Sequence, residues 1–217
     1  FLFLIVKLSI KKMLTMKTFI IMLFLTMCQN LVSQKLPPVF STTSLYNGEE
    51  YEYNSKRGNY ALDTHNERDQ YVGLWEYNQN GILFQLKIEK MDKAIYRREY
   101  IPESKGHWEY SDILILRYCL VKNDILLFDN LNESDVDPIV NYAIKFGLRN
   151  YANGRIWDRT RNIIGSHTIT RLETNPPKII FKLGRSKNIF MNEITSYYDN
   201  QPLYSIPTDG VEMLKID

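Results

Sequence analysis

The sequence holds few of the residues from which metal, cofactor or nucleophile sites are usually built. It has two cysteines, three histidines and ten glycines among 217 residues. His65, His107 and His167 are not spaced with one another, or with cysteines, as metal ligands are. Nucleophile elbows, phosphate-binding loops and glycine-rich dinucleotide motifs are absent. We therefore predict no catalytic, cofactor-binding or metal-binding residues, and no cofactor.

The chain also lacks an apolar run long enough to cross a membrane as a helix, which takes about 20 residues. The stretch TFIIMLFLTM at 18–27 has ten. A preceding Lys17, a short apolar segment and small residues after it are typical of a secretory signal peptide. We expect residues 1–15 to be an upstream extension and residues 16–33 to be the signal peptide. The protein is then exported to the periplasm, the outer surface or the medium.

Two cleavage sites compete at the end of this leader. Cleavage after Ser33 leaves Gln34 as the first residue, whereas cleavage before Cys28 leaves a lipid-anchored cysteine. We favour the first site, because Met27 is larger than the residue that lipoprotein processing prefers. The mature chain then keeps Cys119 alone, which excludes an intrachain disulfide. Because Cys119 lies in a strand-like run, we predict a buried, inert thiol.

Charge of one sign is not in excess. The full chain has 27 basic and 25 acidic residues, a formal charge of +2. Four of the lysines and none of the acids lie in residues 1–33, so cleavage leaves 23 basic residues against 25 acidic ones and a formal charge of −2. No basic stripe remains that would follow a phosphate backbone. We therefore predict that nucleic acid is not a partner.

The pattern that is present is that of β-structure. Residues 34–68 are polar and rich in turn residues, and we interpret them as an extended N-terminal arm. Residues 69–217 form one β domain, in which no stretch of ten or more residues has a clear helical period. The segment 188–200 is ambiguous between loop and short helix. We expect turns at 150–154 and 159–162.

About nine strands with turns every 8–12 residues predict an all-β fold, a single antiparallel sheet rolled into a lipocalin-like or partly open barrel. The expected strands are 71–77, 82–90, 94–100, 113–121, 125–131, 140–148, 165–173, 178–184 and 211–217.

The motif GLWEY at 73–77 recurs as GHWEY at 106–110. In a strand, the tryptophan of each motif lies on the face opposite the glutamate. We predict that Trp75 and Trp108 pack in the core and that Glu76 and Glu109 face water. These two acids are the natural pair for glycoside hydrolysis, but their exposure argues against that role.

Two other clusters have simple structural explanations. The acidic loop 133–137 lacks the glycine and terminal glutamate of a calcium-binding loop, so we interpret it as a solvated turn. Arg155, Arg159 and Arg161 surround Trp157. A cation–π contact or an exposed turn explains them more simply than an anion site.

The stretch 58–90 resembles a family of small exported Bacteroidota proteins of unknown function. The positions that carry the resemblance are Gly58, Tyr60, Asp63, Asp69, Tyr71, Val72, Gly73 and Trp75. The close of the chain, IPTDGVEMLKID at 206–217, looks like the ending of the same family, whereas GHWEY departs from its pattern. The resemblance implies export and a single domain. It implies no activity, ligand or catalytic residue.

An aromatic-rich β domain without a catalytic constellation predicts a non-enzymatic binding or interaction module of the cell envelope. The expected partner is a small apolar or carbohydrate ligand, or an envelope protein. A structural envelope component without a ligand remains an alternative, as does a hydrolase whose carboxylates converge only in space. A cavity of about 300–1,000 Å³ lined by Trp and Tyr would favour the binding module.

Overall fold

The computed structural model describes residues 36–45, 57–97, 106–134, 138, 140–145, 150–185 and 202–217. The expected signal peptide with Cys28, and the ambiguous segment 188–200, lie outside the described residues. The chain divides into two compact units, Phe1–Pro38 and Val39–Asp217. The fold below is that of the second unit.

The described residues of this unit form eleven strands and one short 3-10 helix. None of them forms a helix with the length and hydrophobicity needed to span a membrane. The elements are β1 (Ser41–Ser44), β2 (Asn59–Leu62), η1 (Asp69–Tyr71), β3 (Gly73–Gln79), β4 (Ile82–Arg97), β5 (Trp108–Lys122), β6 (Ile125–Asp129), β7 (Tyr142–Lys145), β8 (Tyr151–Asp158), β9 (Ile163–Leu172), β10 (Lys178–Arg185) and β11 (Val211–Lys215).

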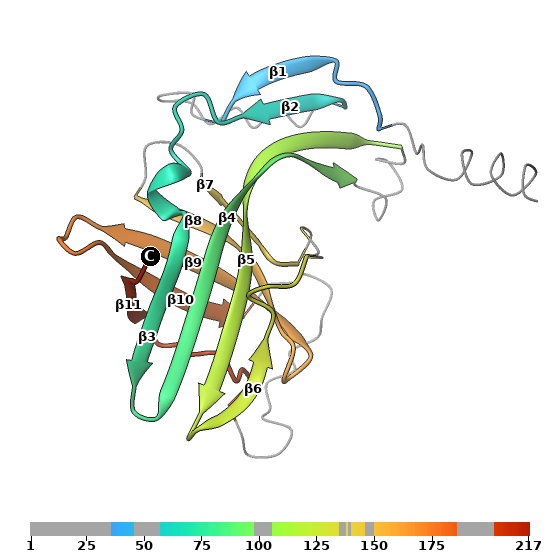
Figure 1. Cartoon of the computed structure of the whole chain (residues 1–217). Coiled ribbons are helices and arrows are strands. Elements are labelled where there is room, and N and C mark those ends of the chain that lie inside the picture. Colours follow the sequence, from blue (N-terminus) through green and yellow to red (C-terminus); the bar gives the residue numbers. More distant parts are fainter. Residues whose placement is uncertain are drawn as a thin grey trace, which may run out of the picture. The chain divides into compact units, whose positions relative to one another are not determined.

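Eight of these strands close into an antiparallel barrel in the order β5-β4-β3-β11-β10-β9-β8-β7 (Figure 1). The closing contact between β7 and β5 is short, with Leu114 opposite Ala143 and Ile115 opposite Tyr142. The buried Asn141 extends it. Its carbonyl accepts a hydrogen bond from the Leu116 amide at 3.1 Å, and its side-chain oxygen accepts one from the Trp157 amide at 3.0 Å. The predicted all-β barrel is confirmed.

The long strands β4 and β5 reach beyond the barrel and carry the arm (Figure 1). The prediction treated residues 82–100 as two strands. Instead, β4 runs from 82 to 97 through an irregularity between Met91 and Ala94, where Lys93 has a φ of 54°. The arm holds two strands that were not predicted: β2 pairs in parallel with β5, and β1 pairs in parallel with β2. These pairings are long-range, which is why local alternation did not indicate them.

Large side chains fill the barrel interior. Trp75, Phe84, Leu116, Ile156 and Phe181 have no solvent-accessible surface. The Phe84 and Phe181 rings lie 5.3 Å apart, and the indole nitrogen of Trp75 donates a 2.8 Å hydrogen bond to a carbonyl of η1. A side chain with no accessible surface has no water-sized void beside it. The core role predicted for Trp75 is confirmed, and the described aromatic side chains of this face pack into the core.

The strands β7 and β8 differ from the prediction. Residues 142–145 of the predicted strand 140–148 form β7, and residues 146–148 lie outside the described residues. The alternation places Tyr142 and Ile144 on the apolar face of this strand, but β7 buries Ala143, which has no exposure, while Tyr142 and Ile144 lie half-buried on the other face. Residues 151–158 form β8, although Asn153-Gly154 suggested a turn. The outer face of a barrel strand can also carry apolar residues, so apolar residues at alternate positions do not by themselves show which face is buried.

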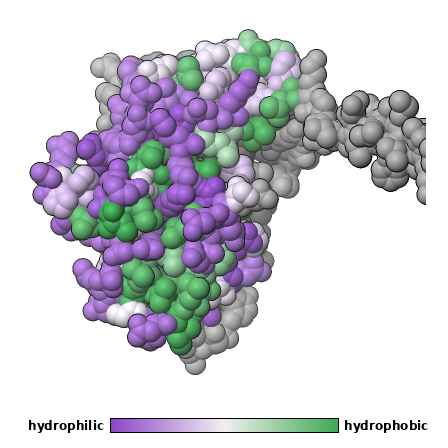
Figure 2. All heavy atoms as spheres, viewed as in Figure 1, coloured by the Kyte–Doolittle hydropathy of each residue, from purple (hydrophilic) through white to green (hydrophobic). Residues whose placement is uncertain are grey.

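Exposed apolar side chains gather near one end of the barrel. Figure 2 shows an apolar patch in the lower part of the molecule, where β6 lies. Ile125 and Leu126 of β6 are 65% and 60% exposed. This patch offers exposed hydrophobic surface.

Candidate functional site

A hollow of about 620 Å³ lies against β7, β8, β9 and β10. The strand register places eight of its described lining residues in two parallel rows. The first row is Tyr142, Arg155, Ser166 and Gly184, and the second is Ile144, Asn153, Thr168 and Lys182. We call this site the outer hollow.

The two rows belong to the outside of the barrel. Between them runs a third row of Ala143, Gly154, His167 and Leu183, one residue from each strand. Ala143, His167 and Leu183 are at most 2% exposed and point inward. Because successive side chains in a strand alternate between faces, the residues on either side of this row point outward.

The lining of the outer hollow is polar and cationic. Ser166 and Thr168 contribute hydroxyl groups and Asn153 an amide, while Arg155 and Lys182 contribute positive charge. No carboxylate occurs among the described residues that line it. Such a surface can donate several hydrogen bonds and favours ligands with hydroxyl or anionic oxygens.

His167 lies behind the floor of the outer hollow, and its ring belongs to the barrel interior. The ring stacks on Phe181 with centroids 5.5 Å apart and planes 20° apart. Neither ring nitrogen has a hydrogen-bond partner within the described residues. Burial lowers the pKa of His167 to about 3, so the imidazole is neutral at neutral pH.

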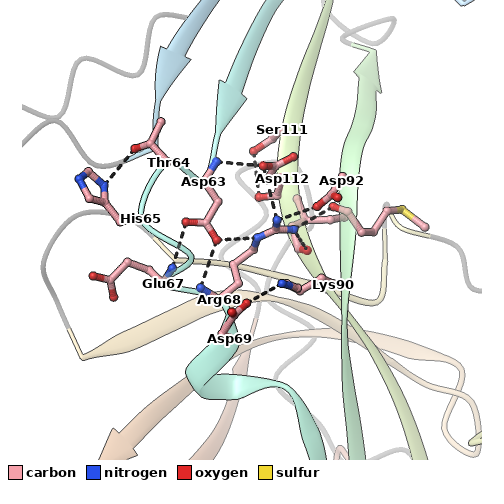
Figure 3. A network of polar contacts seen from close by, with 12 residues as sticks. Asp63, Thr64, His65, Glu67, Arg68, Asp69, Lys90, Asp92, Ser111 and Asp112 are labelled. Atoms are coloured by element: carbon pink, nitrogen blue, oxygen red, sulfur yellow. Dashed lines mark hydrogen bonds and ion pairs between the residues drawn. The ribbon is translucent and has the colours of Figure 1, made fainter.

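A second polar cluster ties the arm to β4 and β5, and we call it the Arg68 cluster (Figure 3). Arg68 is 5% exposed. Its Nε donates to Asp63 at 2.9 Å, its Nη2 donates to Asp92 at 2.6 Å, and the same nitrogen lies 3.5 Å from Asp112. Three carboxylates therefore converge on one guanidinium group.

The buried carboxylates of this cluster are already saturated. Asp112 accepts hydrogen bonds from the Tyr60 hydroxyl at 2.6 Å and from the Asp63 amide at 2.9 Å. Burial alone would raise the pKa of Asp63, but hydrogen bonds from Arg68 and from the Glu67 amide lower it overall. A carboxyl group with a lowered pKa is a poor proton donor near neutral pH. The Arg68 cluster is therefore structural.

The described residues contain no group of three or more His, Cys, Asp or Glu side chains that could hold a metal ion.

The acids of the repeated motif do not meet. Glu76 lies opposite Gln85 of β4, which donates to it at 2.9 Å, and Glu109 lies opposite Tyr96. At about 3.3 Å per residue, these positions are roughly 35 Å apart along β4. The hydrolytic pair considered from the sequence does not form.

The second motif, GHWEY, is not equivalent to the first. Glu109 is 4% exposed, contrary to the prediction that it faces water. Trp108 was predicted in the core, but it is half-buried in the part of β5 that carries the arm. There it contacts Phe40, with ring centroids 5.6 Å apart, and the Arg57 guanidinium, 4.2 Å from its ring centroid. The burial of the two side chains is therefore the reverse of the prediction, because Glu109 is the more buried of the two and Trp108 packs against Phe40 and Arg57 instead of in the barrel core.

The other candidate residues have structural roles. The guanidinium of Arg159 lies 3.6 Å from the centroid of the Trp157 ring, so the predicted cation–π contact is confirmed. Cys119 is 7% exposed, and burial, together with Asp129, raises the pKa of its thiol. Such a thiol is inert at neutral pH, as predicted. Of the acidic loop, Glu133 is exposed, and residues 135–137 lie outside the described residues.

The sequence did not single out the outer hollow. Of its lining residues, Arg155 was explained as a turn residue, and Ser166, Thr168 and Lys182 attracted no attention. The available signal was the polar face of 165–173, opposite the buried positions of the same strand. The hollow forms only when that face lies beside residues of three other strands. This depends on the register between the strands, which cannot be predicted from the sequence pattern.

Comparison with known proteins identifies a family that covers most of the chain. The model of a family of unknown function matches residues 16–215. No curated protein and no solved structure matches the chain.

Proposed function

The chain belongs to that family, DUF6705, and we propose that it is an exported, non-enzymatic module that binds a carbohydrate in the outer hollow. The observation that carries the proposal is the hollow itself. Its volume of about 620 Å³ lies within the range of small-molecule sites, which is about 300–1,000 Å³.

The lining supports a sugar over an apolar ligand. Hydroxyl, amide and cationic groups alternate across β8, β9 and β10 and can pair with sugar hydroxyls. Tyr142 and Ile144 supply an apolar edge of the kind on which a sugar ring packs. Among the described residues, the core side chains of the barrel interior have little or no exposed surface, so they leave little room for an apolar ligand. The cell-envelope address rests on the expected signal peptide.

A binding role is also supported against a hydrolytic one. Ser166 and His167 are adjacent in sequence, but the serine points outward and the histidine inward, so they cannot act as nucleophile and base together. The described lining of the outer hollow has no carboxylate that could act as general acid.

Filling the hollow tests the proposal. Ser166→Trp places a large side chain in the middle of the first row without touching the interior. The matched control is Ile164→Trp, which lies on the same strand and the same face, is 37% exposed and is outside the lining. We expect the unchanged chain and Ile164→Trp to bind a shared set of oligosaccharides on a glycan array. Ser166→Trp should lose at least about tenfold in affinity.

Equal binding by the two tryptophan variants would place the ligand elsewhere and contradict the proposal. Absence of binding to every oligosaccharide on the array would favour the structural envelope component instead, a role with which the filled interior is compatible.

A further inference from the structure

We infer that the carbohydrate bound in the outer hollow carries an acidic group, a carboxylate or a phosphate, and that Arg155 and Lys182 bind this group. The inference rests on the proposed function and specifies the class of its ligand.

The geometry places the two cations on either side of the hollow's centre. Arg155 of β8 pairs with Ser166 of β9, and Lys182 of β10 pairs with Thr168 of β9. Their Cα atoms are separated by two strand spacings, about 10 Å, and by two residues along the strand, about 7 Å. A ligand resting on Ser166 and Thr168 therefore lies between two positive charges.

These two cations differ from the barrel cations that already form ion pairs. Arg117 pairs with Glu89, Lys90 pairs with Asp69, and Lys178 pairs with Glu212 at 2.6 Å. Within the part of the chain that the structure describes, neither Arg155 nor Lys182 has an ion-pair partner. Their charge is available to a ligand without breaking an existing contact.

The wall itself carries no compensating charge. Asp158 is the single acidic residue in the sequences of β8, β9 and β10. It has no exposure, and its oxygens accept hydrogen bonds from Ser205 and Ile206. The outer face of these strands is therefore positive in a mature chain whose formal charge is expected to be −2. The guanidinium group of arginine and the ammonium group of lysine are the side-chain groups that bind carboxylates and phosphates most strongly.

Matched charged and neutral sugars test the inference by titration calorimetry at low salt. Trigalacturonate is compared with its methyl ester, and glucose 6-phosphate with glucose, so that the two arms distinguish a carboxylate from a phosphate. The proteins are the unchanged chain, the double variant Arg155→Gln/Lys182→Gln, and the control Lys178→Gln. Lys178 is a lysine of β10 outside the hollow.

We expect at least one acidic sugar to bind at least about tenfold more tightly than its neutral partner. The double variant should lose that preference, and Lys178→Gln should keep it within about twofold. Raising the salt from 20 to 200 mM should weaken acidic-sugar binding to the unchanged chain, because added ions screen exposed charges.

Neutral sugars that bind as well as acidic ones, with no effect of the double variant, would overturn the inference and leave the proposed function standing. Acidic sugars that bind the double variant unchanged would overturn it as well. If no sugar binds, charged or neutral, both the inference and the proposed function fail.

Discussion

Two buried polar residues, Asp158 and His167, differ in whether their polar atoms have hydrogen-bond partners. Asp158 has no exposure, and its carboxylate accepts hydrogen bonds from the amide and hydroxyl of Ser205 at 2.5 and 2.6 Å, as well as from Thr160 and Arg161. It thereby holds the segment before β11 against the end of β8. His167 is equally buried, but its ring has no such partners within the described residues. An unpaired polar group in a protein interior costs about 1–3 kcal/mol.

Because its imidazole is buried without such partners among the described residues, His167 makes the stability of the fold depend on pH. Burial lowers the pKa of His167 to about 3, whereas an unfolded histidine titrates near 6.5. Between these pH values the unfolded chain binds a proton that the folded chain does not. We therefore expect His167 to reduce the free energy of unfolding as the pH falls from about 6.5 to about 3, by at most ~1.4 kcal/mol per pH unit.

Urea denaturation at pH 7, 6 and 5 measures the effect. His167→Leu should show a shallower loss of stability on acidification than the unchanged chain. The control His65→Leu changes an exposed histidine and should keep the original slope. Identical slopes for the unchanged chain and His167→Leu would show that the imidazole does not titrate in this way.

At the scale of elements, β8 shows how a local turn signal can predict the wrong secondary structure. Asn153-Gly154 is a strong turn signal, yet the two residues lie within an eight-residue strand. Gly154 does not have a positive φ, so the turn conformation does not explain it. Its role is to let two strands lie close together, because a Cβ added there would fall on the carbonyl oxygen of Tyr142 and 2.8 Å from the Cα of Ala143. The glycine therefore lets β7 approach β8 next to the short closing contact with β5.

Substitution of this glycine tests its role. Gly154→Ala should destabilise the chain by about 2–4 kcal/mol, because backbone atoms of β7 must move. The control is Gly184→Ala on β10, where the nearest atom to an added Cβ is 4.0 Å away, and we expect a change below about 1 kcal/mol. Denaturant midpoints of the two variants measure the difference, and equal midpoints would contradict the assigned role of Gly154.

At the scale of the whole unit, the arm and the barrel are joined mainly by backbone pairing and the Arg68 cluster. Several residues that carry the resemblance in the stretch 58–90 lie at this junction. Tyr60 donates to Asp112, Asp63 holds Arg68, and Asp69 pairs with Lys90. We conclude that this motif builds the structure, which is consistent with a functional site on the other side of the closing contact, on β7–β10.

Removing the central charge should loosen the arm. Arg68→Met leaves the carboxylates of Asp63 and Asp112 buried without their counter-charge, which costs about 3–5 kcal/mol in comparable cases. The control Lys90→Met breaks an exposed pair and should cost about 1 kcal/mol or less.

Urea denaturation gives the free energies, and hydrogen exchange of residues 57–63 shows whether the arm opens. We expect faster exchange there in Arg68→Met than in Lys90→Met. If the two variants have the same stability and exchange, the Arg68 cluster does not hold the arm.

Local patterns in the sequence were enough to predict the class of the fold, most of the barrel strands and the core role of Trp75. These features depend on alternation within one strand and on local turn residues, which are encoded over a few positions. Four features needed the three-dimensional structure: which face of β7 is buried, that 151–158 is a strand, that Glu109 is buried, and that Arg155 and Lys182 share one hollow. Each of these depends on register between segments far apart in the chain. A shift of one residue would turn every side chain of a strand to the other face, and no short stretch of sequence contains that information.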